Sequence, residues 1–324
     1  MDGRFNLVHR YNDGTVKRSI SFKNLITDSG LNAWGNGRSD AITSCFLGTG
    51  NAAPQVSDIS LQTQVTSTSN VIANSFITDY VSGTPDYIRT RRAWRFSPGS
   101  LNNVNVAEVG VGSGSSSLFS RARIVDTNGL PAVITILPDE FLDVYWEFRF
   151  YPPTADATAS VTISGAGTYG ITVRPINVTS SIVNSGGNVF DGPTYGWRPF
   201  TGTSLNSVAF QQNYAGFSSP TQLELKVLTR TTLFARTATY SDVVRDTVSP
   251  FTPTQITSPY VNGTFYRDSE LIIPDNQGVL TPGQRLYVFP VSALGNWQIL
   301  LSDYLPKSAD KFLRMNFRFS WGRA

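Results

Sequence analysis

The chain is poor in the side chains that most protein chemistry uses near neutral pH. Its 324 residues include one histidine, His9, and one cysteine, Cys45. Imidazole and thiolate groups serve as general bases, nucleophiles and metal ligands, so we predict a protein that is not an enzyme and holds no metal or cofactor. Because a single cysteine cannot form an intramolecular disulfide, the chain is not a disulfide scaffold.

Long hydrophobic runs and dense charge are missing too. No apolar stretch approaches the roughly 18 residues of a membrane-spanning helix. The first residues also lack the basic-then-apolar pattern of a signal peptide, so we predict synthesis in the cytoplasm and no membrane insertion. Charged residues make up 15% of the chain and the net charge is +3. This charge is too sparse for the basic stripe of a nucleic-acid-binding protein, and we predict no nucleic-acid partner.

The residues that are abundant are typical of β-structure. Aromatic residues make up 12% of the chain, and Thr, Ser and Val are frequent. Near the N-terminus, Asp13 and Gly14 form a turn signal between two alternating segments, which predicts a β-hairpin. We therefore predict an all-β fold of one or two β-sandwich-like domains. The low charge also suits a surface partly covered by neighbours, because interface cores are depleted in charged residues.

One short helix is expected near the N-terminus. Phe22, Leu25 and Ile26 have the i, i+3, i+4 spacing of one helical face, and glycines that follow limit its length. The four-residue spacing of Leu61 and Val65 predicts one or two further helical turns. From Arg89 onward, most of the chain has the period of strands.

Two long segments, 142–151 and 312–321, alternate strictly between apolar and polar residues. This period of two predicts strands with one face in the core and one face available for contacts. The second strand must be paired, either at the centre of a sheet or across a subunit boundary, because an unpaired apolar edge promotes aggregation. Four side chains on the polar faces are candidate interface residues: Tyr145, Arg149, Arg314 and Arg318.

Two consecutive prolines, Pro152 and Pro153, end the first long strand, since neither can donate a hydrogen bond to a sheet. We predict a domain boundary there, with an N-terminal β domain over residues 1–153 and a C-terminal β domain over 154–324. The alternative is a loop within one continuous sandwich. Residues 180–200 and 250–259 have no clear period and are expected to be irregular, and Trp197 in the first of them is a further candidate contact residue.

The few groups that could support chemistry have simpler structural explanations. His9 falls in an alternating strand, where a surface or interface role is expected, and Cys45 lies in an apolar run that predicts a buried thiol. Asp139, Glu140 and Asp143 form the densest acidic cluster. Such carboxylates could hydrolyse a glycoside or bind a cation, but the Pro-Asp-Glu sequence also predicts a turn before a strand.

Several short segments follow one another along the chain: Asn24–Leu31, Leu47–Pro54, Leu61–Val65, Val106–Gly112, Leu118–Ala122, Ile134–Glu140, Tyr260–Asp268, Leu305–Lys307 and Ser320–Arg323. Taken in this order, they resemble a block common in tail-associated structural proteins of bacteriophages. The resemblance spans nearly the whole chain, and the order of the segments carries it more than any single one. It implies a virion component of the tail, baseplate, fibre or collar region, and it carries no catalytic residues.

We therefore expect a structural subunit of a phage virion, made in the cytoplasm of the host bacterium. Its partners would be other virion proteins (tail, baseplate, collar or connector) and further copies of itself in a symmetric or ring-like oligomer. Alternatives are a receptor-binding module for host surface glycans, a capsid decoration protein and a glycan depolymerase. The interface residues expected are Tyr145, Arg149, Arg314, Arg318 and Trp197.

Overall fold

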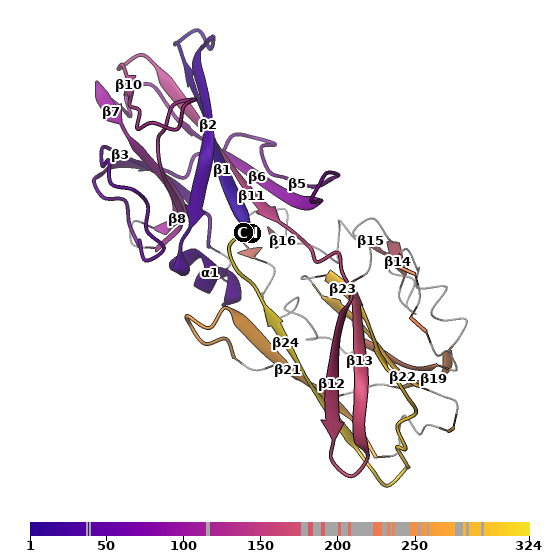
Figure 1. The fold of residues 1–324 in the computed structure, drawn as a ribbon. Coiled ribbons are helices and arrows are strands. Elements are labelled where there is room, and N and C mark those ends of the chain that lie inside the picture. The colour runs from indigo at the N-terminus through magenta and orange to yellow at the C-terminus, as the bar shows by residue number, and fades with distance from the viewer. Residues whose placement is uncertain are drawn as a thin grey trace.

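The computed structural model folds into two β-rich lobes, with both chain termini at the junction between them (Figure 1). The prediction of an all-β chain with one short helix is confirmed. None of the helices in the described residues is long and apolar enough to cross a membrane. The described residues are 1–36, 38, 40–114, 117–175, 181–183, 189–191, 200–201, 207–208, 223–228, 232–233, 235–236, 247–251, 254–257, 259–275, 281–282, 285–292 and 295–324.

The N-terminal lobe is built on one nine-stranded antiparallel sheet, in the order β4-β3-β8-β9-β2-β1-β11-β6-β5. Strands β7 and β10 of the same lobe form a separate two-stranded sheet. The strands are β1 (Asp2–Arg10), β2 (Val16–Ile26), β3 (Ser44–Gly48), β4 (Gln64–Thr68), β5 (Ile77–Val81), β6 (Tyr87–Phe96), β7 (Val104–Val106), β8 (Glu108–Gly114), β9 (Ser117–Arg123), β10 (Ile134–Ile136) and β11 (Phe141–Phe150).

This sheet curls until its two ends are joined. The chain leaves β4 and pairs at once with β6 near the opposite end of the sheet, where Val71 bridges Trp94. Backbone hydrogen bonds from Ile72 to Ala93 and from Arg95 to Asn70 hold that junction, at 2.9 Å each. The closure satisfies backbone groups that an open edge would expose.

The inner face of the curled sheet forms one large hydrophobic core. The predicted hairpin and the predicted strand over 142–151 are both present and pair directly, with Phe5 opposite Trp146 and Leu7 opposite Val144. All four side chains are at most 1% exposed. Burying a side chain of this kind contributes about 1.5–3 kcal/mol, so the alternating pattern of these strands determines which face points inward.

The predicted position of the helix is wrong, because the helix begins later in the chain than the spacing indicated. Phe22 and Ile26 belong to β2 and face the core, while α1 spans Asp28–Gly35. Thr27 caps it, since its hydroxyl oxygen accepts a hydrogen bond from the Gly30 N–H. Gly30 also lies so close to the Phe119 carbonyl that a β-carbon would overlap it, which fixes the helix against β9. The helical turns predicted around Leu61 are absent, because Leu61 lies in an irregular segment that leads into β4, and Val65 belongs to that strand.

The C-terminal lobe consists of several antiparallel sheets. A six-stranded sheet has the order β12-β13-β23-β22-β18-β19, a three-stranded sheet has the order β20-β21-β24, and two small hairpins pair β14 with β15 and β16 with β17. The strands are β12 (Ala157–Ile163), β13 (Gly167–Pro175), β14 (Ser181–Val183), β15 (Val189–Asp191), β16 (Phe200–Thr201), β17 (Ser207–Val208), β18 (Leu223–Leu228), β19 (Thr247–Phe251), β20 (Thr254–Thr257), β21 (Tyr266–Ile273), β22 (Arg285–Ser292), β23 (Gly295–Leu301) and β24 (Leu313–Ser320).

The two larger sheets of this lobe share a core in the manner of a sandwich. Leu313 from β24 and Ile273 from β21 join Ile299 and Leu301 from β23 in one buried cluster. The alternation predicted over 312–321 is therefore correct for Leu313 and Met315, which both contribute to it. The alternative of a sheet-centre position is wrong, because β24 is an end strand of the three-stranded sheet.

Two regions expected to be irregular contain strands. Residues 250–259 include the end of β19 and all of β20, and residues 180–200 include β14 and β15. The first expectation was wrong because it treated proline as a strand breaker. Pro250 lies in β19, the end strand of its sheet, where residues on the outer edge need not donate a backbone hydrogen bond to a neighbouring strand.

The end of the chain returns to the N-terminal lobe. Trp321 packs in the N-terminal core, edge-on to Trp34 with ring centroids 5.3 Å apart. Arg323 donates to the Ile26 carbonyl and pairs with Asp28 at the start of α1. The sheets divide between β11 and β12, near the boundary predicted at residue 153. That boundary stays a prediction, since the last residues of the chain complete the first core.

Candidate functional site

The acidic cluster singled out in the sequence is bound within the fold. His9, which was expected at a surface, is 3% exposed and its Nε2 lies 2.7 Å from the Glu140 carboxylate. Lys17 binds the other oxygen of Glu140. Asp143 is fully buried and accepts hydrogen bonds from Arg10 at 2.9 Å and from Arg95 at 2.7 and 2.9 Å. These carboxylates join strands of the N-terminal lobe. Residues 138–139 form a turn directly before β11, as predicted.

The ionisation of Glu140 follows from these contacts. Burial opposes the charged form, but the Lys17 ammonium, the Leu137 N–H and the His9 ring outweigh it and lower the pKa of Glu140 to about 2. The carboxylate therefore stays ionised and paired through the neutral range. This is the behaviour of a structural ion pair.

A buried charged pair that sequence analysis missed lies at Glu108. Its carboxylate, fully buried, accepts from the backbone N–H groups of Gly50, Gln62 and Thr63 and from the Arg121 guanidinium at 2.8 and 3.0 Å. An acid within an otherwise apolar strand was the signal for it. The pair fixes the loop between β3 and β4 onto β8.

Cys45 is buried, as predicted. Burial in the apolar core raises the pKa of its thiol well above the ordinary value. The thiol therefore remains protonated and unreactive near neutral pH.

The outer face of β11 carries two of the predicted contact residues. Tyr145 lies between Asn6 of β1 and Ala93 of β6, and it is half-buried. Arg149 binds Glu147 through Nε at 2.6 Å, and its guanidinium lies over the ring of Tyr87, 4.6 Å from the centroid. Burial opposes the charge of Arg149, but Glu147 outweighs it and raises the pKa of the guanidinium. The result is a rigid surface of arginine and tyrosine.

Beside Tyr145 the same face is hollowed into a pocket of about 280 Å³. Arg4 from β1 and Arg91 from β6 line it, on either side of Glu147 in one row across the sheet. Neither arginine has a hydrogen bond or an ion pair within the described part of the chain, and the Nε of Arg91 is buried. Sequence analysis missed both residues, because only the register of three strands brings them together.

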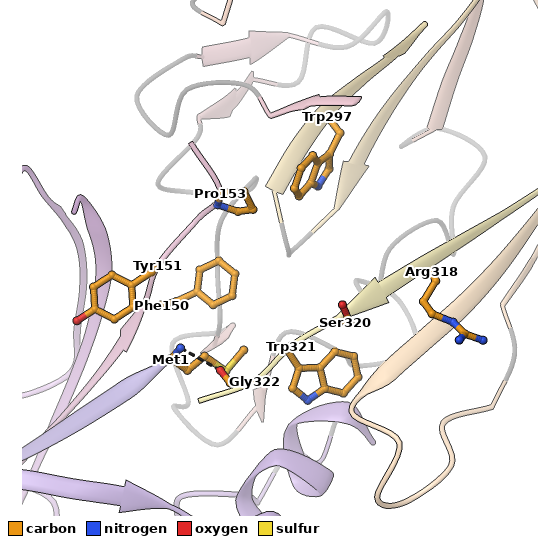
Figure 2. A pocket seen from close by; sticks show the side chains of 9 residues that line it. All are labelled: Met1, Phe150, Tyr151, Pro153, Trp297, Arg318, Ser320, Trp321 and Gly322. Atoms are coloured by element: carbon orange, nitrogen blue, oxygen red, sulfur yellow. Dashed lines mark hydrogen bonds between the residues drawn. The ribbon is translucent and has the colours of Figure 1, made fainter. Parts of the chain in front are cut away.

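A second cavity, of about 340 Å³, lies at the junction of the lobes (Figure 2). Phe150 and Tyr151 reach it from the end of β11, while Trp297 of β23 and Trp321 reach it from the C-terminal part of the chain. Arg318, a predicted contact residue, also lines it. The cavity is therefore aromatic, with one guanidinium at its side.

Arg314 and Arg318 project from β24 and are 59% and 58% exposed. Arg318 forms two hydrogen bonds to Asp268, at 2.8 and 2.9 Å, and lies 3.7 Å from the ring centroid of Tyr266. Arg314 pairs more loosely with Glu270, at 3.4 Å. Both therefore lie on an exposed face, as predicted.

A third hollow, an apolar groove of about 520 Å³, lies between the end strands β12 and β24. Val161 and Ile163 line one side, and Leu313 and Met315 line the other. Phe312 at its border is 60% exposed. The groove marks the place where the two sheets of the C-terminal lobe stay apart.

The structure thus separates the predicted contact residues into two groups. Tyr145 and Arg149 lie on the outer face of the N-terminal lobe, and Arg314 and Arg318 lie on β24. Trp197 lies outside the described residues. Within the described residues, no three histidine, cysteine, aspartate or glutamate side chains come together as a metal site requires.

Comparison with known proteins gave no match to a family model, a curated protein or a solved structure.

Proposed function

We propose that this chain is a structural subunit of a bacteriophage particle, attached at the tail, baseplate, fibre or collar. It would act by associating with further copies of itself and by docking on neighbouring virion proteins. The single observation that carries this proposal is the edge of β12 beside the apolar groove, which is uncharged and has no paired strand among the described residues. The assignment to a phage rests on the order of the sequence motifs, and the mode of action rests on this edge.

The edge of β12 lacks the features that prevent strands from pairing with other molecules. Its seven residues, Ala-Thr-Ala-Ser-Val-Thr-Ile, contain no charge and no proline, and its pairing with β13 has no bulge. Monomeric proteins usually protect end strands with one of these features. Because the edge is neutral, the same strand of a second copy could pair with it without like charges meeting. A two-fold axis would then extend the six-stranded sheet from one copy into the next.

The solution mass of the full chain tests this association. Ser160 is exposed in the middle of β12, and Ser160→Lys would place a charge at the centre of the contact. We expect the wild type to form oligomers, measured by light scattering after gel filtration. The variant should dissociate at concentrations roughly tenfold higher than the wild type does. The matched control is Ser67→Lys, an exposed serine on β4 of the other lobe. A monomeric wild type, or an equal effect of both changes, would contradict the proposed association.

Docking on a neighbouring protein is supported by two surfaces of arginine and aromatic residues, one around Arg149 on the N-terminal lobe and one around Arg318 on β24. Tyr, Trp and Arg are enriched in interface centres. Truncation of a buried interface anchor typically weakens binding by about 1–3 kcal/mol, and we expect this for Arg149→Ala and Arg318→Ala. Particle stability in heat or urea measures the loss. Unchanged stability in both variants would remove these residues from the interface.

Imaging of the intact particle tests the virion assignment itself. Density for a two-lobed subunit at the tail, baseplate, fibre or collar supports it. Copies spread in hundreds over the head would favour a capsid decoration protein instead. Particles without the subunit would overturn the assignment.

A receptor-binding role is the second candidate, and the aromatic cavity between the lobes favours it. The rings of Phe150, Tyr151 and Trp297 line this space, and aromatic faces can pack against the apolar faces of ligands such as sugars. We expect the purified protein to bind host lipopolysaccharide in this case, with loss of binding on Trp297→Ala. A protein that binds no surface glycan would leave only the assembly role.

A further inference from the structure

We propose that the pocket on the outer face of the N-terminal lobe binds a phosphate dianion, either free or as an ester. Arg4 and Arg91 would hold the anion from two sides, with Tyr145 at the wall of the pocket. The strand register places the two arginines in one row, on either side of Glu147 of β11. This site goes beyond the proposed function, because assembly of protein subunits requires no small anion.

The charges around the pocket do not balance. Three arginines and one glutamate line it: Arg4, Arg91, Arg149 and Glu147. One oxygen of Glu147 accepts from both Nε and a terminal nitrogen of Arg149, at 2.6 Å each. That pair is satisfied on its own, so the pocket keeps two positive charges.

The neighbouring strands add to this imbalance. Lys23 of β2 lies directly opposite Arg4 in the strand register, and like charges in such positions repel each other. The nearest acid on the other side is Asp79, but Arg89 already holds it through two hydrogen bonds, at 2.9 and 2.5 Å. Arg89 and, at longer range, Arg91 lower the pKa of Asp79, so this carboxylate is ionised and occupied.

The burial of Arg91 adds an independent argument. Its Nε is shielded from solvent and has no hydrogen-bond partner among the described residues. A buried charged donor without an acceptor is costly, and native proteins rarely leave one unsatisfied. An anion in the adjoining pocket would supply the missing acceptor. The unpaired arginines are therefore explained by a ligand.

Two positive charges favour a dianion over a monoanion. A phosphate group carries close to two negative charges at neutral pH and offers several acceptor oxygens. The planar guanidinium groups of arginine match such oxygens through paired hydrogen bonds. A carboxylate would neutralise only one of the two charges. The geometry therefore selects phosphate over acetate-like groups.

Titration calorimetry on the full chain at pH 7.5 tests the site, with inorganic phosphate as the probe and sodium acetate at equal ionic strength as the comparison. We expect saturable phosphate binding and roughly tenfold weaker acetate binding. Arg91→Gln should weaken phosphate binding by roughly tenfold or more. Because Arg4 is exposed, Arg4→Gln should fold normally and still weaken binding several-fold, even where Arg91→Gln does not fold.

The control variant is Arg18→Gln, which removes one positive charge from exposed β2 outside the pocket. It should bind phosphate as the wild type does. Glycerol 1-phosphate distinguishes a phosphate ester from free phosphate as the ligand. Binding as tight as that of inorganic phosphate indicates an ester on a larger molecule. Weaker binding indicates the free ion. Absence of saturable binding, equal binding of acetate, or an equal loss in Arg18→Gln would overturn the site.

Discussion

The two lobes treat the edges of their sheets in opposite ways. In the N-terminal lobe, the segment after β4 pairs with β6, and the curled sheet joins its own ends. In the part of the C-terminal lobe that the structure describes, β12 and β24 remain end strands with an apolar groove between them. A closed sheet satisfies its own hydrogen bonds, whereas an open one leaves them for a partner. The comparison distinguishes a lobe whose sheet ends are joined from one whose described sheets keep open edges.

The charged groups follow the same division. Glu108, Glu140 and Asp143 of the N-terminal lobe are at most 3% exposed and bind several donors each. In the C-terminal lobe, Asp156 pairs with Arg174 and Arg236 at a site where all three side chains are 26–35% exposed. Buried pairs are sensitive to the loss of one partner, while exposed pairs contribute little. Mutations at the two kinds of site should therefore lower the free energy of unfolding of the two lobes by different amounts.

The largest expected effect is that of Glu108→Ala. It would remove one of the two carboxylates that pair with the buried Arg121 guanidinium, leaving Asp58, and it would free three backbone N–H groups. We expect the free energy of unfolding of the N-terminal lobe to fall by about 3–5 kcal/mol. Urea denaturation followed by tryptophan fluorescence measures it, since Trp34, Trp94 and Trp146 are all buried in this lobe.

The matched change in the other lobe is Asp156→Ala, which removes an exposed carboxylate from two arginines. We expect a loss of about 0–1 kcal/mol. Comparable losses in both variants would contradict the division into a tightly closed lobe and an open one.

An effect of up to the same size is expected from Trp321→Ala, which tests how the lobes are coupled. Trp321 follows β24 directly but lies 9% exposed in the N-terminal core, against Trp34 and Tyr260. Truncation should lower the free energy of unfolding of that core by at most about 3–5 kcal/mol. The loss is smaller if Tyr260 moves into the space that the Trp321 ring leaves. Differential scanning calorimetry should then resolve two transitions in place of one.

The control for Trp321 lies just before the same strand. Phe312 is 60% exposed, and Phe312→Ala should change the free energy of unfolding by no more than about 0.5 kcal/mol. A single transition in Trp321→Ala, unchanged in position, would mean that the end of the chain does not couple the lobes.

A further effect is that of acid on Glu140. The pKa of this carboxyl lies near 2, below its ordinary value of 4.5, so its ion pairs stabilise the fold above about pH 4.5 and are lost as the pH falls toward 2. Glu140→Gln should cost about 1–3 kcal/mol at pH 7. The difference between wild type and variant should shrink between pH 4.5 and 2 in urea titrations. A difference that does not change with pH would contradict this assignment.

Local pattern predicted the strands well and the helix badly. The alternation over 142–151 correctly identified the buried face of β11, because a residue's position in a strand determines its side. Phe22 and Ile26 satisfy the spacing of a helix as well as that of a strand. Pairing of β2 with β1 and capping by Thr27 decided between them, and neither contact is encoded in the spacing.

The candidate sites could be predicted only in part. Tyr145 and Arg149 were found because they lie on one strand whose polar face is visible in the sequence. The pocket beside them also needs Arg4 and Arg91, which come from strands 87 positions apart in the chain (91 − 4) and meet only through β11. No local pattern connects such residues.

The sequence by itself determined the all-β class, the hairpin at the start and the inward faces of the long strands, because these depend on the period of apolar residues. The tertiary structure alone decided which edges are closed, which carboxylates are buried and which arginines have no partner among the described residues. Those properties depend on the register between distant strands. Register is set by the packing of the whole core, in which the N-terminal lobe is completed by Trp321, three residues from the last position.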